Sequence, residues 1–288
     1  MVASVDSFYR VVTEAINDIL EHGYDSQERL EGWLQRLSQA AKHSLVPLEV
    51  VDANLRKLLL AVFARTTRAD KLMRLHRGVS KYTIAQVQPK LRAELDRRIL
   101  ASAQLIKLHR EQAIAEMLRR AAGWMTSVPK GGTDVAKRGQ IRKDVRKSIA
   151  GLSFIDRRVV IDQGHKLSAA VNEIVATDGG AIAAIYHSHW RESGYDYRPE
   201  HKARDGKIFL VRDSWAHKDG LVKAASHEYT DEIDAPAHLP YCRCYWEFLY
   251  SPSQLPSEML TQKGREKLAE VRKQMASFSG AMTHAAHG

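Results

Sequence analysis

The feature that most restricts the fold is the helical spacing of apolar residues through about the first 125 positions. In the first segment these residues recur every three or four positions, from Val5 through Val12 to Ile19. Such spacing places them on one face of a helix. Later segments repeat the pattern, with glycine or proline at their ends: Gly23, Pro47, Gly78, Pro89 and Gly123. The sequence therefore predicts a module of neighbouring antiparallel helices, residues 1–125, whose apolar stripes form a core.

The chain changes character after this module. Val128-Pro129-Lys130-Gly131-Gly132 is typical of a turn or linker. Between Lys130 and Arg158, nine basic residues (130, 137, 138, 142, 143, 146, 147, 157, 158) stand against three aspartates (134, 144, 156). We expect residues 126–155 to form a basic linker or helix. A concentrated positive charge favours polyanions as partners, although it can also simply keep a surface solvated.

The second half mixes helix and strand patterns. A helix is expected over Asp156–Ala176, ended by Asp178-Gly179-Gly180, and strands near 181–190, 207–211 and 245–250. A polar helix is expected from Ser257, followed by a disordered tail from Ser279. The predicted class is α+β: a mostly helical N-terminal module followed by a small mixed α/β C-terminal domain. The expected divisions are 1–125, 126–155, 156–256 and 257–288.

Composition and charge limit the cellular location and the kinds of partner that we expect for this chain. The net charge is +10, and the two cysteines, separated by one residue, form no disulfide framework. Charged residues interrupt the first twenty positions, so we expect no secretory signal, and no apolar run is long enough for a membrane span. We expect a protein made in a cytoplasm without a membrane partner. A phosphate-binding glycine loop and a G-x-S-x-G elbow are both missing from the sequence.

The first candidate site is the pair His187 and His189 at the end of the strand-like run. Residues two apart on a strand share a face, so both imidazoles can point at one metal ion. With Asp196 they resemble the zinc ligands of JAMM-type metalloisopeptidases, which implies a zinc-dependent hydrolase. The other interpretation is two histidines at a strand end without a metal.

The second candidate site lies in Pro236-Ala-His238-Leu-Pro240-Tyr-Cys242-Arg-Cys244. Two thiols and an imidazole within seven residues offer three soft ligands, and His201 offers a fourth. This set, His201, His238, Cys242 and Cys244, predicts a zinc site. The alternative is a buried turn in which the cysteines act as small apolar side chains.

The same region carries an ordered series of motifs. Arg198 and His201 form an Arg-x-x-His motif, and Asp205-Gly206 follows. Pro236-x-His238-x-x-x-Cys242-Arg243-Cys244 comes later, with Tyr245-Trp246 after it. Over residues 156–267 this order resembles the Mu F-type head morphogenesis proteins of tailed phages. The helical N-terminal half lies outside the resemblance.

The resemblance implies a minor head protein that is not an enzyme. It implies the portal protein, together with capsid or scaffold proteins, as partners, and the virion head as location after assembly in the host cytoplasm. Double-stranded DNA is a further expected partner, bound without sequence preference through phosphate contacts. The residues expected to bind DNA are Lys137, Arg138, Arg142, Lys143, Arg146 and Lys147. A bacterial DNA-binding module with a structural metal remains a further interpretation.

Overall fold

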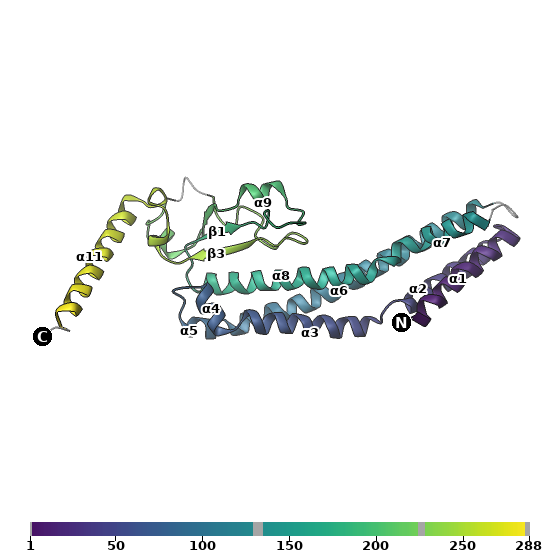
Figure 1. Ribbon diagram of the computed structural model, residues 1–288, viewed down its shortest axis with the longest axis horizontal. Helices are drawn as coiled ribbons and strands as arrows, with labels where there is room; N and C mark the ends of the chain where they lie inside the picture. The colour runs from purple at the N-terminus through teal and green to yellow at the C-terminus, as the bar shows by residue number, and fades with distance from the viewer. Residues whose placement is uncertain (1, 129–134, 224–227, 286–288) are drawn as a thin grey trace. The chain divides into compact units, whose positions relative to one another are not determined.

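The computed structural model describes residues 2–128, 135–223 and 228–285 (Figure 1). Its class is α+β, as predicted: helices dominate, and a small antiparallel sheet lies near the C-terminus. Lys130 and Asp134, which belong to the predicted basic stretch, lie outside the described residues. Among the described helices, none combines the length and apolar content that a bilayer span requires.

The chain divides into two compact units, Met1–Leu59 with Arg97–Gln163, and Leu60–Asp96 with Gly164–Gly288. These divisions differ from those expected at 125 and 155. The reason is that three long helices contribute to both units: α3 (Leu48–Thr66), α6 (Gln88–Ser127) and α8 (Leu152–Asp178). A pattern read along the chain marks helices, but it cannot tell which part of a long helix belongs to which core.

The first unit contains α1 (Val2–His22), α2 (Gln27–Ser44), α7 (Val135–Ala150) and parts of the three long helices. Its core confirms the predicted apolar stripes. The buried residues are Phe8, Val12, Ala15, Ile16, Ile19, Leu20, Leu37, Ala41, Ile114, Met117, Ala121, Met125, Val145, Ile149 and Leu152. Burial of these side chains, rather than helix propensity, supplies most of the stability of such helices.

Two helix ends differ from the sequence prediction. The spacing of Asp25 and Glu28 in the sequence suggests a helix cap at Asp25, but the capping residue of α2 is Ser26, whose side chain accepts a hydrogen bond from the Arg29 N–H. Asp25 instead pairs with the Arg29 guanidinium. Gly123 does not end a helix, because α6 continues to Ser127. Gly23 ends α1 as predicted, with a φ of 73° that suits glycine.

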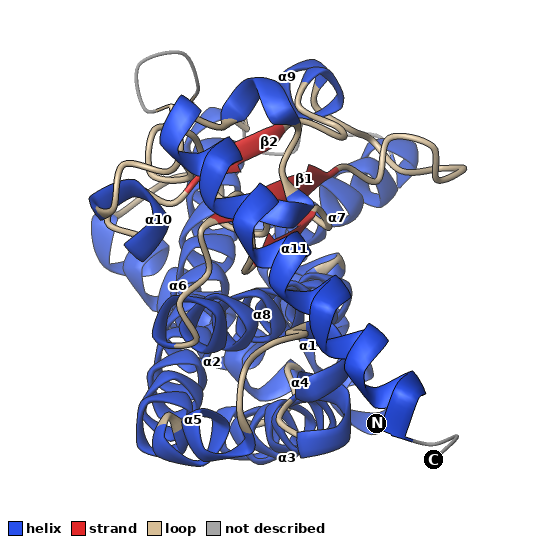
Figure 2. Ribbon diagram, turned by 90° about the vertical axis from the view of Figure 1, so that its left-hand side faces the viewer, coloured by secondary structure: helices blue, strands red, loops and turns tan. Residues whose placement is uncertain are grey.

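The second unit holds two short helices, α4 (Ala69–Leu75) and α5 (Lys81–Gln86), and all the described strands. The strands β1 (Ala183–His187), β2 (Ile208–Leu210) and β3 (Tyr245–Leu249) form a sheet in the order β2-β1-β3 (Figure 2). Both pairings are antiparallel. Among the described residues, sheet therefore appears only after position 180, as the sequence predicts.

Short elements lie between and after these strands. Between β1 and β2 lies α9 (Pro199–Ala203), between β2 and β3 lies α10 (Trp215–Lys218), and η2 (Pro252–Gln254) and η3 (Ser257–Met259) follow β3. One face of the sheet packs Tyr186 and Phe209 against the two cysteines. The C-terminal helix α11 (Gln262–Ala285) continues past Ser279, so the prediction of disorder is wrong for residues 279–285. That segment lacks proline, and its alanines and methionine favour helix.

Candidate metal centre

Two segments far apart in the sequence bring three ligand atoms together. His201 lies on α9, which Pro199 opens at its first turn, and Cys242 and Cys244 immediately precede β3. His201 Nδ1 lies 3.6 Å from Cys242 Sγ and 3.4 Å from Cys244 Sγ. All three residues are buried, and the three ligand atoms lie within 4.8 Å of one another.

These distances fit a zinc ion. Around a tetrahedral zinc with Zn–S of about 2.3 Å and Zn–N of about 2.05 Å, a sulfur and a nitrogen ligand stand about 3.6 Å apart. The two measured nitrogen–sulfur distances lie at or just below that value. Two sulfurs and an imidazole are also the soft donor set that zinc prefers. The residues present therefore suit a Cys2His zinc ion held through Nδ1.

His238 does not belong to this cluster. Its side chain is exposed, and the described metal-ligating group contains only His201, Cys242 and Cys244. The expectation of four clustered residues is therefore wrong for His238. Its proximity in sequence to Cys242 does not place it there, because the intervening turn directs the side chain to solvent. Three protein ligands leave one position of a tetrahedral zinc open to water.

The hydrogen bonds of Cys242 and Cys244 favour a thiolate at one of the two cysteines. A hydrogen bond from the Cys242 thiol lowers the pKa of Cys244, and a hydrogen bond with His201 adds to this. The same coupling to Cys244, together with burial, raises the pKa of Cys242. The thiolate is the form that binds metals, so Cys244 is prepared for a ligand role. Burial also raises the pKa of the neighbouring Tyr186 hydroxyl, which stays protonated.

The remaining motif residues hold the loops around the cluster. Arg198 Nη2 donates to the Pro240 carbonyl at 3.1 Å, which links the start of α9 to the cysteine loop. Asp205 accepts from the Ser188 N–H and from Trp190 Nε1, both at 2.8 Å. These contacts lower the pKa of Asp205. The motif therefore ties three loops to one site.

Gly206, Pro236 and Arg243 complete the motif. Gly206 adopts a φ of 78° in the turn before β2, and its N–H donates to the Tyr186 carbonyl at 2.8 Å. Pro236 is buried, whereas Arg243 is exposed with its guanidinium 5.7 Å from the Tyr195 ring. Arg243 therefore lies on the surface of the cysteine loop, while its two neighbouring cysteines point inward.

The cysteine loop is held in an uncommon backbone conformation. Ala237 and Tyr241 have φ values of 67° and 62°, in the left-handed region that residues with a Cβ rarely adopt. Each such residue costs about 1 kcal/mol or more, so surrounding contacts must hold it. One of these contacts is the Tyr195 hydroxyl, 3.4 Å from the Tyr241 carbonyl. The two residues flank the stretch that leads into Cys242.

The alternative zinc set of His187, His189 and Asp196 does not form a cluster among the described residues. His187 Nε2 lies 2.8 Å from Glu247 Oε2, and its ring stacks on Tyr245 at 4.8 Å. His189 lies beyond the end of β1, so the two-residue spacing of a strand does not align the two rings. Asp196 is exposed in the following loop. The two histidines instead contact surface side chains, His187 with Glu247 and His189 with the Tyr195 ring.

A pocket of about 350 Å³ reaches the cluster from the surface of the second unit. Cys244 forms part of its wall, together with His189, Glu192 and Arg243 from the loops. His165 and Asn172 on α8 form another part. Neither these α8 residues nor Tyr186 were predicted from the sequence. A regular helix pattern gives no sign that a histidine 79 positions before Cys244 lines the same pocket.

The predicted DNA-binding residues lie on α7, in the first unit. Arg142, Lys143 and Lys147 are exposed. Arg146 is half-buried over the Tyr9 ring at 4.8 Å, and Arg138 Nη1 donates to Asn17 Oδ1 at 3.3 Å. The Lys137 side chain lies outside the described part of the structure.

A shallow hollow of about 660 Å³ runs along the same helix. Arg142, Lys143, Arg146 and Lys147 line it with Tyr9, and Asp144 is its acidic residue. Helix α7 thus presents a basic surface, while Arg138 is tied to its own unit.

Comparison with known protein families, characterised proteins and solved structures found no match for this chain.

Proposed function

We propose that this chain is a minor head protein of a tailed phage, of the Mu F type. One observation carries the proposal. Three residues of the motif, His201, Cys242 and Cys244, form one buried cluster, and a fourth, Arg198, links the start of α9 to the cysteine loop through the Pro240 carbonyl. A chance match of short motifs would have no reason to meet in this way, whereas a motif that defines one domain requires it.

In this proposal the chain is not an enzyme, and a metal ion at this site would serve to hold the fold together even though its fourth position is left to water. Zinc, when bound, would supply folding energy by linking α9 to the strand β3. His201 would contribute Nδ1 and the two cysteines their sulfurs, of which the Cys244 sulfur already has a pKa lowered by the hydrogen bond from Cys242. The domain then presents its surface to the portal and to capsid or scaffold proteins in the head.

The basic surface of α7 supports contact with packaged DNA. Exposed lysines and arginines neutralise phosphates and release counterions, which needs no particular base sequence. Replacement of Arg142, Lys143, Arg146 and Lys147 by Gln should weaken binding to duplex DNA, and the log–log salt slope should fall by about 0.9 for every phosphate that is no longer neutralised. Equal binding by the variant and the original chain at about 0.1 M salt, where screening extends about 10 Å, would reject DNA contact through α7.

Co-purification tests the head assignment directly. The tagged full chain is expressed together with the portal protein encoded beside its gene, and the complex is isolated at moderate salt. We expect the portal protein to co-elute, and a variant with His201→Ala to lose it because the domain loses its metal link. Failure of the original chain to retain portal protein, or a gene neighbourhood without portal and terminase, would overturn the assignment.

A further inference from the structure

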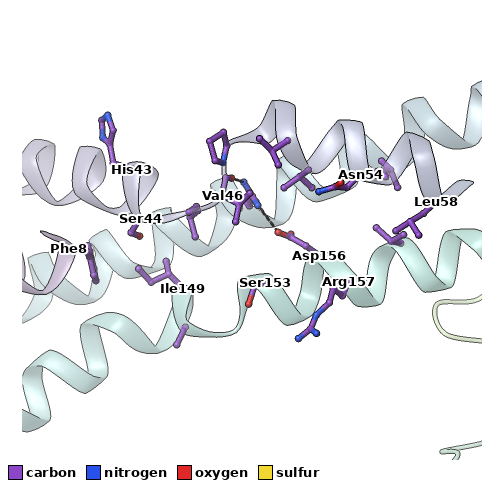
Figure 3. Close-up of a pocket in the computed structure, with 18 of the residues that line it drawn as sticks. Phe8, His43, Ser44, Val46, Asn54, Leu58, Ile149, Ser153, Asp156 and Arg157 are labelled. Atoms are coloured by element: carbon purple, nitrogen blue, oxygen red, sulfur yellow. Dashed lines mark hydrogen bonds and ion pairs between the residues drawn. The ribbon is translucent and has the colours of Figure 1, made fainter. Parts of the chain in front are cut away.

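A long apolar groove in the first unit has no assigned role. Its volume is about 1100 Å³, slightly above the range of roughly 300–1,000 Å³ for small-molecule pockets. The connector Leu45–Pro47 and α3 form one wall, and the end of α7 with the start of α8 forms the other (Figure 3). Arg110 on α6 also lines the groove.

Each wall is one face of a helix. On α3 the lining residues are Val50, Val51, Asn54, Leu55 and Leu58, and on α8 they are Ser153, Asp156, Arg157, Val160 and Ile161. Both series advance by about one helical turn at a time, and from the first to the last residue each rises by about 12 Å along its helix axis. Two helix faces of this kind provide the ridges between which a third helix can pack.

The groove exposes apolar side chains that a folded chain normally covers. Val50 is 47% exposed, Leu58 52% and Ile161 56%. Single exposed apolar residues are common, but several that line one groove mark a binding surface. Covering such side chains provides the main driving force for association.

The charges in the groove indicate the character of the occupant. Asp156 is the one carboxylate among the lining residues, and it is already bonded to Arg110 at 2.7 Å. Arg146 and Arg157 therefore leave the lining positively charged. The chain's own α11 has the wrong sign, with Lys263, Arg265, Lys267, Arg272 and Lys273 against Glu266 and Glu270. A second copy offering α11 would bring like charges together.

We propose that this groove binds an amphipathic α-helix of another protein, one with an apolar stripe flanked by acidic residues. The stripe would cover Leu58 and Ile161, and its carboxylates would lie near Arg146 and Arg157. This mode of recognition, a helix in an apolar groove, places side chains at positions i, i+3, i+4 and i+7 of the ligand in contact. The inference does not depend on the proposed phage function.

Fluorescence anisotropy with the full chain tests the proposal. The probe is a labelled peptide of about 16 residues, roughly four helical turns, with a leucine stripe flanked by glutamates. A matched peptide carries lysines in place of the glutamates. We expect the acidic peptide to bind at least about tenfold more tightly than the basic one, a difference of about 1.4 kcal/mol.

Variants then locate the site. Ile161→Glu and Leu58→Glu should each weaken the acidic peptide by about tenfold or more. Phe154→Glu is the matched control, because Phe154 is also on α8 and 55% exposed but does not line the groove. Arg157→Glu should reverse the preference between the two peptides. All four positions are exposed, and circular dichroism verifies that each variant folds.

Several results would overturn the proposal. These are failure of the acidic peptide to bind, equal binding of both peptides, and equal effects of Phe154→Glu and Ile161→Glu. A dimer in solution that Ile161→Glu converts to a monomer would show that a second copy fills the groove. Binding of anionic vesicles, abolished in Ile161→Glu while the acidic peptide has no effect, would assign the groove to lipid instead.

Discussion

The buried ion pair between Arg110 and Asp156 should be the most sensitive charge contact of the first unit. Arg110 Nε and Nη2 donate to Asp156 Oδ2 at 3.2 and 2.7 Å, and Nη1 donates to the Val46 carbonyl at 2.6 Å. The two side chains are only 7% and 10% exposed. Asp156→Ala would leave the guanidinium buried with the Val46 carbonyl but without its counter-charge.

The size of the effect follows from this burial. Removal of one partner of a buried ion pair costs about 3–5 kcal/mol, because the remaining charge cannot be solvated. Glu14→Ala provides a comparison within the same unit, since it breaks the 2.7 Å pair with Arg36, whose side chains are 53% and 42% exposed. An exposed pair contributes about 0–1 kcal/mol, so the two variants should differ by at least about 2 kcal/mol.

Urea unfolding followed by far-UV circular dichroism measures both variants. A double variant, Arg110→Met with Asp156→Leu, should recover much of the stability, because apolar side chains of similar volume can replace a buried pair without leaving a charge. The reasoning fails if Asp156→Ala costs no more than Glu14→Ala. It fails equally if the double variant is as unstable as Asp156→Ala, because unpaired charge would then not be the cause.

Three further outcomes follow from the second unit. Metal analysis after zinc loading should find zinc with the original chain and with His238→Ala but not with His201→Ala; retention by His201→Ala would contradict the Cys2His centre. Gly264→Ala should destabilise the start of α11, because the added Cβ would meet the Leu221 carbonyl. Gly139→Ala, which has open space around the added Cβ, should not destabilise the protein, and equal melting temperatures of the two variants would contradict the close approach at Gly264. Burial lowers the pKa of His76, so the neutral form stabilises the fold above about pH 6.5, and this stability is lost as the pH falls towards the lower folded-state pKa. His76→Gln should therefore reduce the pH dependence of the unfolding free energy measured in urea, and an unchanged dependence on pH would contradict this.

The helices were predictable because they depend on local spacing. The stripe from Val5 to Ile19 forms α1, and Gly23 and Gly180 end helices with the positive φ that glycine allows. Gly123 was misleading, because a glycine without a positive φ requirement can lie inside a long helix when packing on both sides continues. Helix α5 lacked a pattern long enough to notice.

The candidate site was predictable only in part, because loops set its geometry. The spacing of Cys242 and Cys244 pointed to two candidate ligands, and His201, which lies 41 positions before Cys242, was considered as a further ligand for its imidazole. His238 was included because it is near in sequence, but the backbone turn between it and Cys242 decides where its side chain points. Distances of that kind depend on tertiary contacts such as Arg198 with Pro240, which no local pattern encodes.

The left-handed residues Ala237 and Tyr241 have a consequence for the search for relatives. β-Branched side chains are strongly disfavoured in that conformation, whereas glycine, asparagine and aspartate tolerate it. Distant relatives that share this loop should therefore lack valine, isoleucine and threonine at the positions five before and one before the first cysteine, even where the rest of the loop has diverged. This filter by forbidden residues can be added to the Arg-x-x-His and Cys-Arg-Cys motifs, and it would separate chains with the same loop from chains that share only the cysteines.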